Sequence, residues 1–212
     1  MQGLSLSVRK VELPCKDQDQ AEHIPECKKK AERRFRKRRM KMENRSWKMP
    51  GEAAITEEQM LARIESALLH KDNVVVFVGT DSQTHGRFYN YITVVGLYTP
   101  GKGGTYYFTG ELEERKKFKG AQKLRMFEEV TKSLAVATVL QEKLGISPEV
   151  HLDVSPPHKK EFTSSLAEQL SGYVLSSGFE PKLKPDSWAA SAIADRHARK
   201  GKIVWTDRSS TR

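Results

Sequence analysis

The sequence has few cysteines and no long hydrophobic run. Its 212 residues include only two cysteines, Cys15 and Cys27, and both lie in a polar N-terminal region. No apolar stretch approaches the roughly 20 residues that a membrane-spanning helix needs, and the first residues are too weakly apolar for a secretory signal. These features argue against a disulfide-stabilised secreted protein and against a membrane protein. We expect a cytoplasmic protein with free thiols and no membrane partner.

Positive charge is concentrated in one segment. Hydrophobic residues make up 37% of the chain and charged residues 30%, as expected of a globular protein with a modest core. Residues 28–48 contain twelve Lys and Arg against two Glu, a net charge of +10, which is also the net charge of the whole chain. The other residues therefore sum to zero, with 25 basic against 25 acidic side chains.

Residues 1–50 show no sustained hydrophobic periodicity, and we interpret them as a disordered basic arm before a domain over residues 51–212. Such an arm neutralises phosphates, and its affinity for a polyanion falls steeply with salt. Phe35 and Trp47 are candidates for stacking on bases. A solvated arm without a specific partner is the alternative. The predicted nucleic-acid contacts are Lys28, Lys29, Lys30, Arg33, Arg34, Arg36, Lys37, Arg38 and Arg39.

The hydrophobic pattern after Pro50-Gly51 alternates between strands and helices. Thr56 to Gln59 forms a capping box for a helix that ends near His70. The further predictions are strands at 73–80, 88–98 and 105–109, a charged loop at 111–119, a helix at 121–143, a strand at 149–154, a helix at 159–176, an edge strand at 179–184, a helix at 187–199 and a strand at 203–205. The short connections make the first three strands an antiparallel meander. The β-β-β-α-β-α-β-α order predicts an α/β fold with a mixed five-stranded sheet, flanking helices and an extra N-terminal helix.

Four acids fall on the strands and helices around this predicted sheet. Asp81 follows a buried valine-rich run and is expected to end the first strand, and Asp153 lies near the end of the fourth. The strand after the first crossover helix usually returns beside the first strand, so these two carboxylates become neighbours. Glu129, with Glu128 as the alternative, lies beside the apolar stripe of a helix, and Asp195 lies on an alanine-rich helix that can pack closely. Taken singly, each acid is more typical of a cap or of a surface ion pair than of a metal site.

Carboxylates drawn together cannot all stay ionised without a cation. Mg²⁺ or Mn²⁺ suits oxygen ligands, and two such ions about 4 Å apart stabilise the attacking and leaving oxygens of phosphodiester hydrolysis. The pattern therefore predicts a metal-dependent nuclease acting on RNA, DNA or an RNA/DNA hybrid. A non-catalytic nucleic-acid-binding protein with the same fold is the alternative, and a structural protein that binds a stabilising ion is a third. Candidates for additional roles are His85 and His197 for proton transfer and Lys182 and Lys184 for phosphate contacts.

Several sequence blocks resemble the ribonuclease H-like YkuK family. They are Gly79 to Gln83, Arg125 to Ser133, His151 to Ser155, Gly172-Tyr173, Gly178-Phe179, Lys184 to Ala190 and Ala194 to Arg196. The resemblance covers about residues 55–200 and not the basic arm. It implies a ribonuclease H-like fold, and it implies less about activity because one fold hosts many functions. By the ribonuclease H pattern, the metal ligands and catalytic residues would be Asp81, Glu129, Asp153 and Asp195.

Overall fold

The computed structural model describes residues 45–119, 121–157 and 164–199. The chain divides into two units, residues 1–43 and 44–212, and the described residues all belong to the second. The predicted nucleic-acid contacts at positions 28–39, Phe35, and the predicted strand at 203–205 lie outside the described residues. The strands are β1 (Ser46–Trp47), β2 (Ile55–Thr56), β3 (Val75–His85), β4 (Phe88–Thr99), β5 (Gly103–Glu114), β6 (Glu149–His151) and β7 (Glu180–Lys182). The helices are α2 (Glu57–His70), the 3₁₀ helix η1 (Arg115–Phe118), α3 (Gln122–Leu144), α4 (Ser164–Ser176), the π-helix η2 (Ala189–Ala194) and α5 (Asp195–Arg199).

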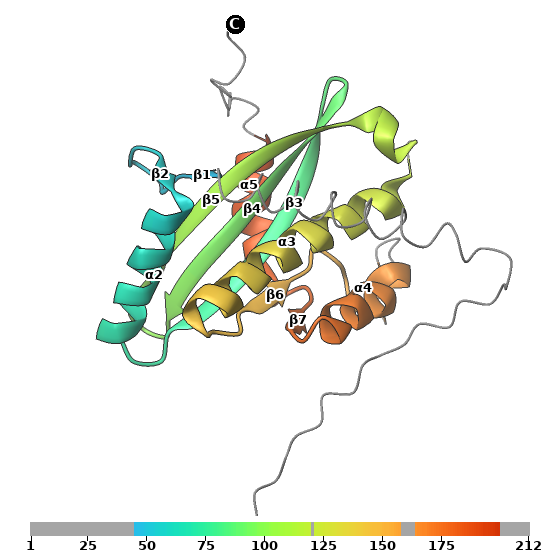
Figure 1. Ribbon diagram of the computed structural model, residues 1–212. Coiled ribbons are helices and arrows are strands. Elements are labelled where there is room, and N and C mark those ends of the chain that lie inside the picture. The colour runs from blue at the N-terminus through green and yellow to red at the C-terminus, as the bar shows by residue number, and fades with distance from the viewer. Residues whose placement is uncertain (1–44, 120, 158–163, 200–212) are drawn as a thin grey trace, which may run out of the picture. The chain divides into compact units, whose positions relative to one another are not determined.

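A mixed five-stranded sheet in the order β5-β4-β3-β6-β7 forms the centre of this unit (Figure 1). Strands β3, β4 and β5 pair antiparallel as a meander, whereas β6 runs parallel to β3 and β7 runs parallel to β6. The predicted α/β class and the predicted order of strands and helices are confirmed. Strand β7 lies at the edge of the sheet. Proline at position 181 is tolerated there, because the open side of an edge strand has no neighbouring strand to which a backbone N–H would donate.

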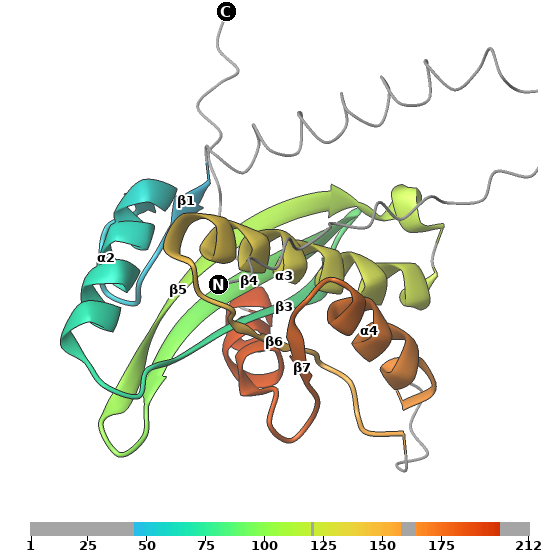
Figure 2. The same cartoon turned by 60° about the horizontal axis from the view of Figure 1, so that its bottom comes forward.

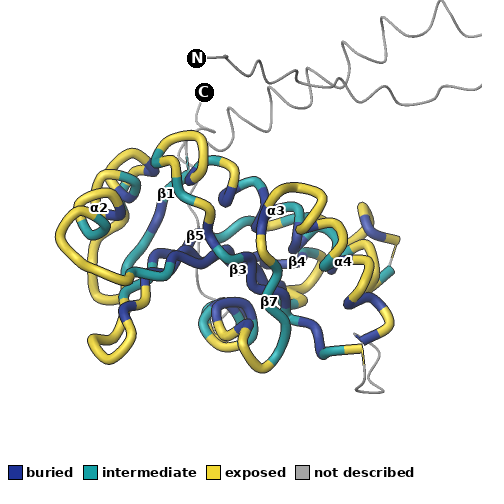
Figure 3. The backbone as a smooth tube through the Cα atoms, turned by 90° about the horizontal axis from the view of Figure 1, so that it is seen from below, coloured by how far each residue is buried: buried dark blue, intermediate teal, exposed yellow. Residues whose placement is uncertain are grey.

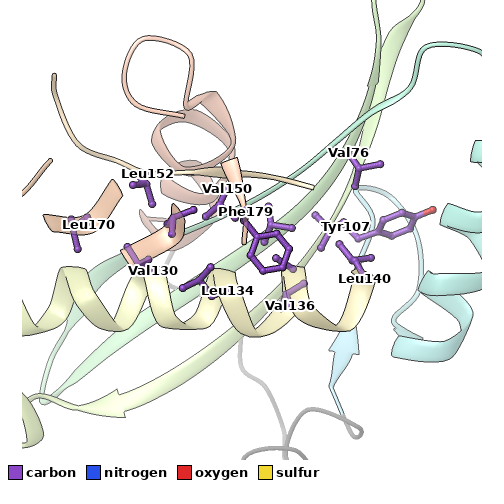
Figure 4. Close-up of a cluster of buried hydrophobic side chains, with 14 of the residues drawn as sticks. Val76, Tyr107, Val130, Leu134, Val136, Leu140, Val150, Leu152, Leu170 and Phe179 are labelled. Atoms are coloured by element: carbon purple, nitrogen blue, oxygen red, sulfur yellow. The ribbon is translucent and has the colours of Figure 1, made fainter. Parts of the chain in front are cut away.

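Helices cover both faces of the sheet. Helices α2, α3 and α4 lie on one face, and η2 and α5 lie on the other (Figures 1 and 2). Val76 and Val78 of β3 join the hydrophobic cluster under α3 and α4, part of which is shown in Figure 4, whereas Phe77 packs with Ala189 and Ala194. In Figure 3 the buried backbone is concentrated in the strands, and the outer turns of α2 are exposed. Burial on both faces explains why the first strand is an uninterrupted apolar run rather than an alternating one.

Strand β3 is longer than predicted, which changes the position of Asp81. Its antiparallel pairing with β4 continues to His85↔Phe88, so Asp81 lies inside a strand, opposite Ile92, and does not end it. On the other side of β3, the parallel pairing with β6 stops at Gly79↔His151. Asp81 therefore lies beyond the end of the parallel half of the sheet. Strand β5 also extends to Glu114, so the predicted charged loop is partly a strand.

The folded unit begins before residue 50. Trp47 in β1 is 0% exposed and belongs to the main hydrophobic cluster, together with Met60 and Ile64 of α2. Lys48 and Phe108 exchange two backbone hydrogen bonds of 2.9 Å, which attach this segment to β5. The interpretation of Trp47 as a base-stacking residue of the arm is wrong, because its ring is needed to fill the space between α2 and the sheet.

The helices follow the predicted pattern except at the C-terminal end. At the start of α2, Gln59 N donates to Thr56 Oγ1 over 3.2 Å and Thr56 N donates to Gln59 Oε1 over 3.0 Å, so the capping box is confirmed. The alanine-rich segment was expected to be one α-helix, but it is a π-helix, η2, that continues into the short helix α5. Among the described residues, no helix has both the length and the apolar character needed to cross a membrane.

Candidate acidic site beyond the end of strand β6

Side-chain alternation along β3 distributes the site over both faces of the sheet. Successive side chains of a strand point to opposite faces, so Asp81 shares the face of Phe77, which packs on η2. Ser82 points to the opposite face, toward α3. Continuing the parallel register Gly79↔His151 by two residues brings Asp81 level with Asp153, just after the end of β6. The predicted neighbourhood of these two acids follows from this register.

Gly79 allows η2 to approach β3 closely. A Cβ atom on Gly79 would lie 2.8 Å from the backbone nitrogen of Ala190, which is closer than real side chains come. The backbone N–H of Ala189 donates to Nδ1 of the buried His151 over 3.2 Å and so attaches the start of η2 to β6. Asp195 follows directly after η2, and Gln83 Nε2 donates to its Oδ1 over 3.1 Å. The fourth predicted acid is thus connected to the same strand as Asp81.

Glu129 reaches the site from α3. Ser82 Oγ donates to Glu129 Oε1 over 2.6 Å, and Arg125 Nε, one helical turn earlier, lies 3.8 Å from the same oxygen. Glu128, the alternative weighed from the sequence, instead lies 3.4 Å from Lys132 Nζ. The structure therefore places Glu129, and not Glu128, against β3.

The carboxylates interact electrostatically across the open end of the sheet. Burial raises the pKa of Asp81 to about 7, with further contributions from the negative charges of Asp153 and Asp195. Burial likewise raises the pKa of Glu129 to about 8, with repulsion from Asp81 and then Asp153. The hydrogen bond from Ser82 and the charge of Arg125 act in the opposite direction on Glu129. All four predicted acids are therefore within electrostatic reach of Asp81 or Glu129.

Several of these carboxylates already have partners in the protein. Lys184 Nζ lies 2.8 Å from Asp153 Oδ1, an ion pair without the alignment of a hydrogen bond. Within residues 45–199, where described, no three His, Cys, Asp or Glu side chains form a group that could hold a metal ion. Glu129 comes from α3, on the face of the sheet opposite to that of Asp81, and Asp195 accepts a hydrogen bond from Gln83. The chemistry of the site nevertheless fits Mg²⁺ or Mn²⁺, since all four side chains offer carboxylate oxygens, and burial together with neighbouring negative charge raises the pKa of two of them.

The other predicted residues lie in different surroundings. His85 is exposed at the end of β3. His197 packs on the sheet, with its ring stacked 3.9 Å from the ring of Phe108 and its Nε2 3.1 Å from Tyr106 Oη. Lys182 Nζ lies 2.7 Å from Glu180 Oε1, so this lysine, like Lys184, is paired with a carboxylate.

Three residues that contact the acids are not among the predicted site residues. These are Ser82, which binds Glu129, Gln83, which binds Asp195, and Arg125, which faces Glu129. A signal was present for Arg125, because it precedes Glu129 by four residues and such pairs are neighbours on a helix surface. For Ser82 and Gln83 the signal was weaker, since their partners are distant in sequence.

The mixed five-stranded sheet in the order β5-β4-β3-β6-β7, with helices on both faces, is the fold of the ribonuclease H-like class of α/β proteins. The chain belongs to the ribonuclease H-like family, because the family model described as Ribonuclease H-like matches residues 59–199. It is also similar to "Uncharacterized protein YkuK" of Bacillus subtilis (strain 168), with 28% identity over 166 residues that cover 70% of this chain and 94% of that protein. No solved structure gives a significant match. The resemblance seen in the sequence blocks is confirmed.

Proposed function

We propose that this protein is a divalent-metal-dependent nuclease that hydrolyses phosphodiester bonds of RNA, DNA or an RNA/DNA hybrid. Asp81, Glu129, Asp153 and Asp195 would hold Mg²⁺ or Mn²⁺. The observation that supports the proposal is the register that makes Asp81 level with Asp153, together with the hydrogen bonds from Ser82 to Glu129 and from Gln83 to Asp195. Structural ion pairs also perturb pKa values, but acids that raise one another's pKa are typical of functional sites.

The residues of the chain have distinct tasks in this proposal. When bound, the divalent ions would activate water and stabilise the leaving 3′ oxygen. Ser82 orients Glu129, and Gln83 orients Asp195, through the hydrogen bonds that they donate. Lys184 brings a positive charge to the same end of the sheet, which favours the approach of a phosphate.

The test uses the full chain with Mg²⁺ or Mn²⁺ and labelled single-stranded RNA, DNA duplex and RNA/DNA hybrid. We expect metal-dependent cleavage of at least one substrate, and a loss of about 100-fold or more in rate for Asp81→Asn, because a carboxylate that would hold the metal is removed. Glu128→Gln is the matched control, since Glu128 adjoins Glu129 but pairs with Lys132, and it should keep the wild-type rate. No cleavage by the wild type, or equal cleavage by Asp81→Asn, would contradict the proposal.

A non-catalytic nucleic-acid-binding protein is the second candidate. The ion pair between Lys184 and Asp153 favours it, because one of the four acids already has a cationic partner. In that case the hybrid should bind with equal affinity to the wild type and to Asp81→Asn, and no divalent metal should give cleavage. The same set of proteins and substrates therefore separates the two functions.

A further inference from the structure

A second cationic region lies on the folded unit, at the end of the sheet where the β3–β4 hairpin meets η1 (Figures 1 and 2). The backbone N–H of Arg115 donates to the carbonyl of Arg87 over 2.9 Å, and Arg115 Nη1 donates to the carbonyl of Gly86 over 3.2 Å. These bonds attach the hairpin turn to the start of η1. A surface hollow of about 470 Å³ lies where the hairpin turn and η1 meet, and it is lined by Arg87, Glu114, Arg115, Lys116 and Lys119.

The charge around this hollow is strongly one-sided. Arg87 and the segment 114–125 together contain seven Lys and Arg and a single Glu, although the chain outside residues 28–48 is neutral. Lys116 Nζ lies 2.6 Å from Glu114 Oε2, and Lys117 pairs with Glu113. Among the described residues, no carboxylate lies within ion-pair distance of Arg87, Arg115 or Lys119. The region therefore keeps a local excess of positive charge.

The aromatic rings of this region are covered by cations. The guanidinium of Arg87 lies 5.1 Å from the centre of the Phe88 ring, and that of Arg115 lies 5.6 Å from the Tyr89 ring. Phe118 is buried and has Lys117 Nζ 5.5 Å from its ring centre. The rings are thus unavailable as platforms for bases, whereas the cations above them can bind phosphates. Such a surface suits the backbone of a duplex, whose bases are already stacked on one another.

Arg125 connects this region to the acidic site. Its guanidinium lies 5.5 Å from the ring of Tyr89, the ring that Arg115 also contacts, and its Nε lies 3.8 Å from Glu129 Oε1. That Nε is buried without a hydrogen-bond partner. Positive side chains therefore extend from the hairpin turn to the edge of the carboxylate cluster, so a backbone bound in the hollow would lie beside the acids.

We propose that the hollow formed by Arg87, Arg115, Lys116 and Lys119 binds the sugar–phosphate backbone of a nucleic-acid duplex, independently of the basic arm. The proposal rests on the proposed function for the nature of the ligand and for the use of the acids next to it. Binding itself requires neither a metal nor cleavage, so it can be measured separately. The contacts should be independent of sequence and sensitive to salt.

The test is fluorescence anisotropy with a labelled RNA/DNA hybrid in EDTA, over a series of salt concentrations. The parent is the full chain in which the nine predicted arm contacts are replaced by Gln. In this parent, Arg87→Gln, Lys116→Gln and Lys119→Gln are combined. We expect the dissociation constant to rise about tenfold. The slope of the logarithm of the association constant against the logarithm of the salt concentration should become less steep by about 2 to 3, since each lost phosphate contact reduces its magnitude by about 1.

The matched control combines Lys71→Gln, Lys102→Gln and Lys143→Gln, which removes three exposed charges elsewhere on the unit, and it should change the affinity less than twofold. The proposal is overturned if both triple variants lose affinity equally, if neither does, or if the parent does not bind. Weaker binding by the first triple variant, without any cleavage by the wild type, would refute the proposed nuclease activity and support the proposed duplex-binding hollow. If cleavage depends on Asp81 but the first triple variant binds as well as its parent, only the proposed duplex-binding hollow would be refuted.

Discussion

At the scale of single residues, Asp81 and Glu129 make stability depend on pH. Their pKa values in the folded protein are about 7 and 8, against ordinary values of 3.8 and 4.5. The folded state thus holds protons that the unfolded chain releases, and this contribution is complete below about pH 4 and is lost as pH rises through 7 and 8. We expect the melting temperature in EDTA to fall between pH 5.5 and 8.5. Asp81→Asn and Glu129→Gln should each raise the free energy of unfolding at pH 8.5 by about 1–3 kcal/mol.

Glu128→Gln is the control for this pH dependence as well. Its neighbour Lys132 is also paired with Glu111 and Glu113, both at 2.9 Å, so the network around Lys132 survives the change. The melting temperature of this variant should follow the wild-type dependence on pH. Parallel curves for the wild type, Asp81→Asn and Glu129→Gln would show that burial of these two carboxylates in their charged form does not limit stability.

The same residues show what a sequence can predict about a site of this kind. The four acids could be chosen as candidates because each lies beside an apolar strand or stripe that predicts its place in the sheet. The choice between Glu128 and Glu129 could not be made, since both lie at the edge of the stripe and only the contact with Ser82 distinguishes them. The position of Asp81 inside a strand was missed because the polar residues 80–85 do not continue the apolar pattern, although β4 pairs with all of them.

At the scale of secondary-structure elements, the contact between η2 and β3 depends on the missing side chain of Gly79. In Gly79→Ala the new methyl group would lie 2.8 Å from Ala190 N and 3.1 Å from Ala189 Cβ, so η2 must shift. We expect a loss of about 1–3 kcal/mol in the free energy of unfolding, measured by urea denaturation. Because Asp195 follows η2, metal-dependent activity should fall as well.

Gly172→Ala provides the matched control for this substitution. Gly172 is exposed in the middle of α4, and a Cβ atom there would meet nothing within 4 Å. Alanine favours a helix over glycine by up to about 1 kcal/mol, so this variant should be as stable as the wild type or more stable. Equal stability of Gly79→Ala and the wild type would mean that η2 adapts without cost.

The π-helix itself could not be predicted from the alanine-rich segment. The segment has the composition of an ordinary α-helix, and its pattern predicts one over 187–199. Its conformation depends on contacts from elsewhere, namely the bond from Ala189 N to His151 Nδ1 and the close approach to Gly79. Short π-helical segments are frequent at functional sites. Here the residue after the π-helix is Asp195.

At the scale of the whole molecule, the order of strands and helices and the pairing of the strands were the most predictable properties. Short connections require antiparallel pairing and helical crossovers allow parallel pairing, so the meander and the parallel strands β6 and β7 followed from spacing alone. The predicted start of the folded unit is too late, since Trp47 lies within the basic segment 28–48 but is buried under α2. Charge composition describes a segment well, but it does not show which single aromatic residue the core needs.

The separation of charge along the chain leads to a prediction about the basic arm. The segment 28–48 carries the entire net charge of +10, so it should supply long-range, sequence-independent attraction and should not supply chemistry. Replacing the nine predicted arm contacts by Gln in the full chain should weaken binding of a long duplex by about 100-fold or more at low salt, and should flatten its salt dependence. The single-turnover cleavage rate of a short hybrid at saturating protein should stay within about threefold of the wild type, because the carboxylates lie outside the arm. If that rate falls as far as it does in Asp81→Asn, the arm takes part in the reaction itself and does more than hold the substrate near the site.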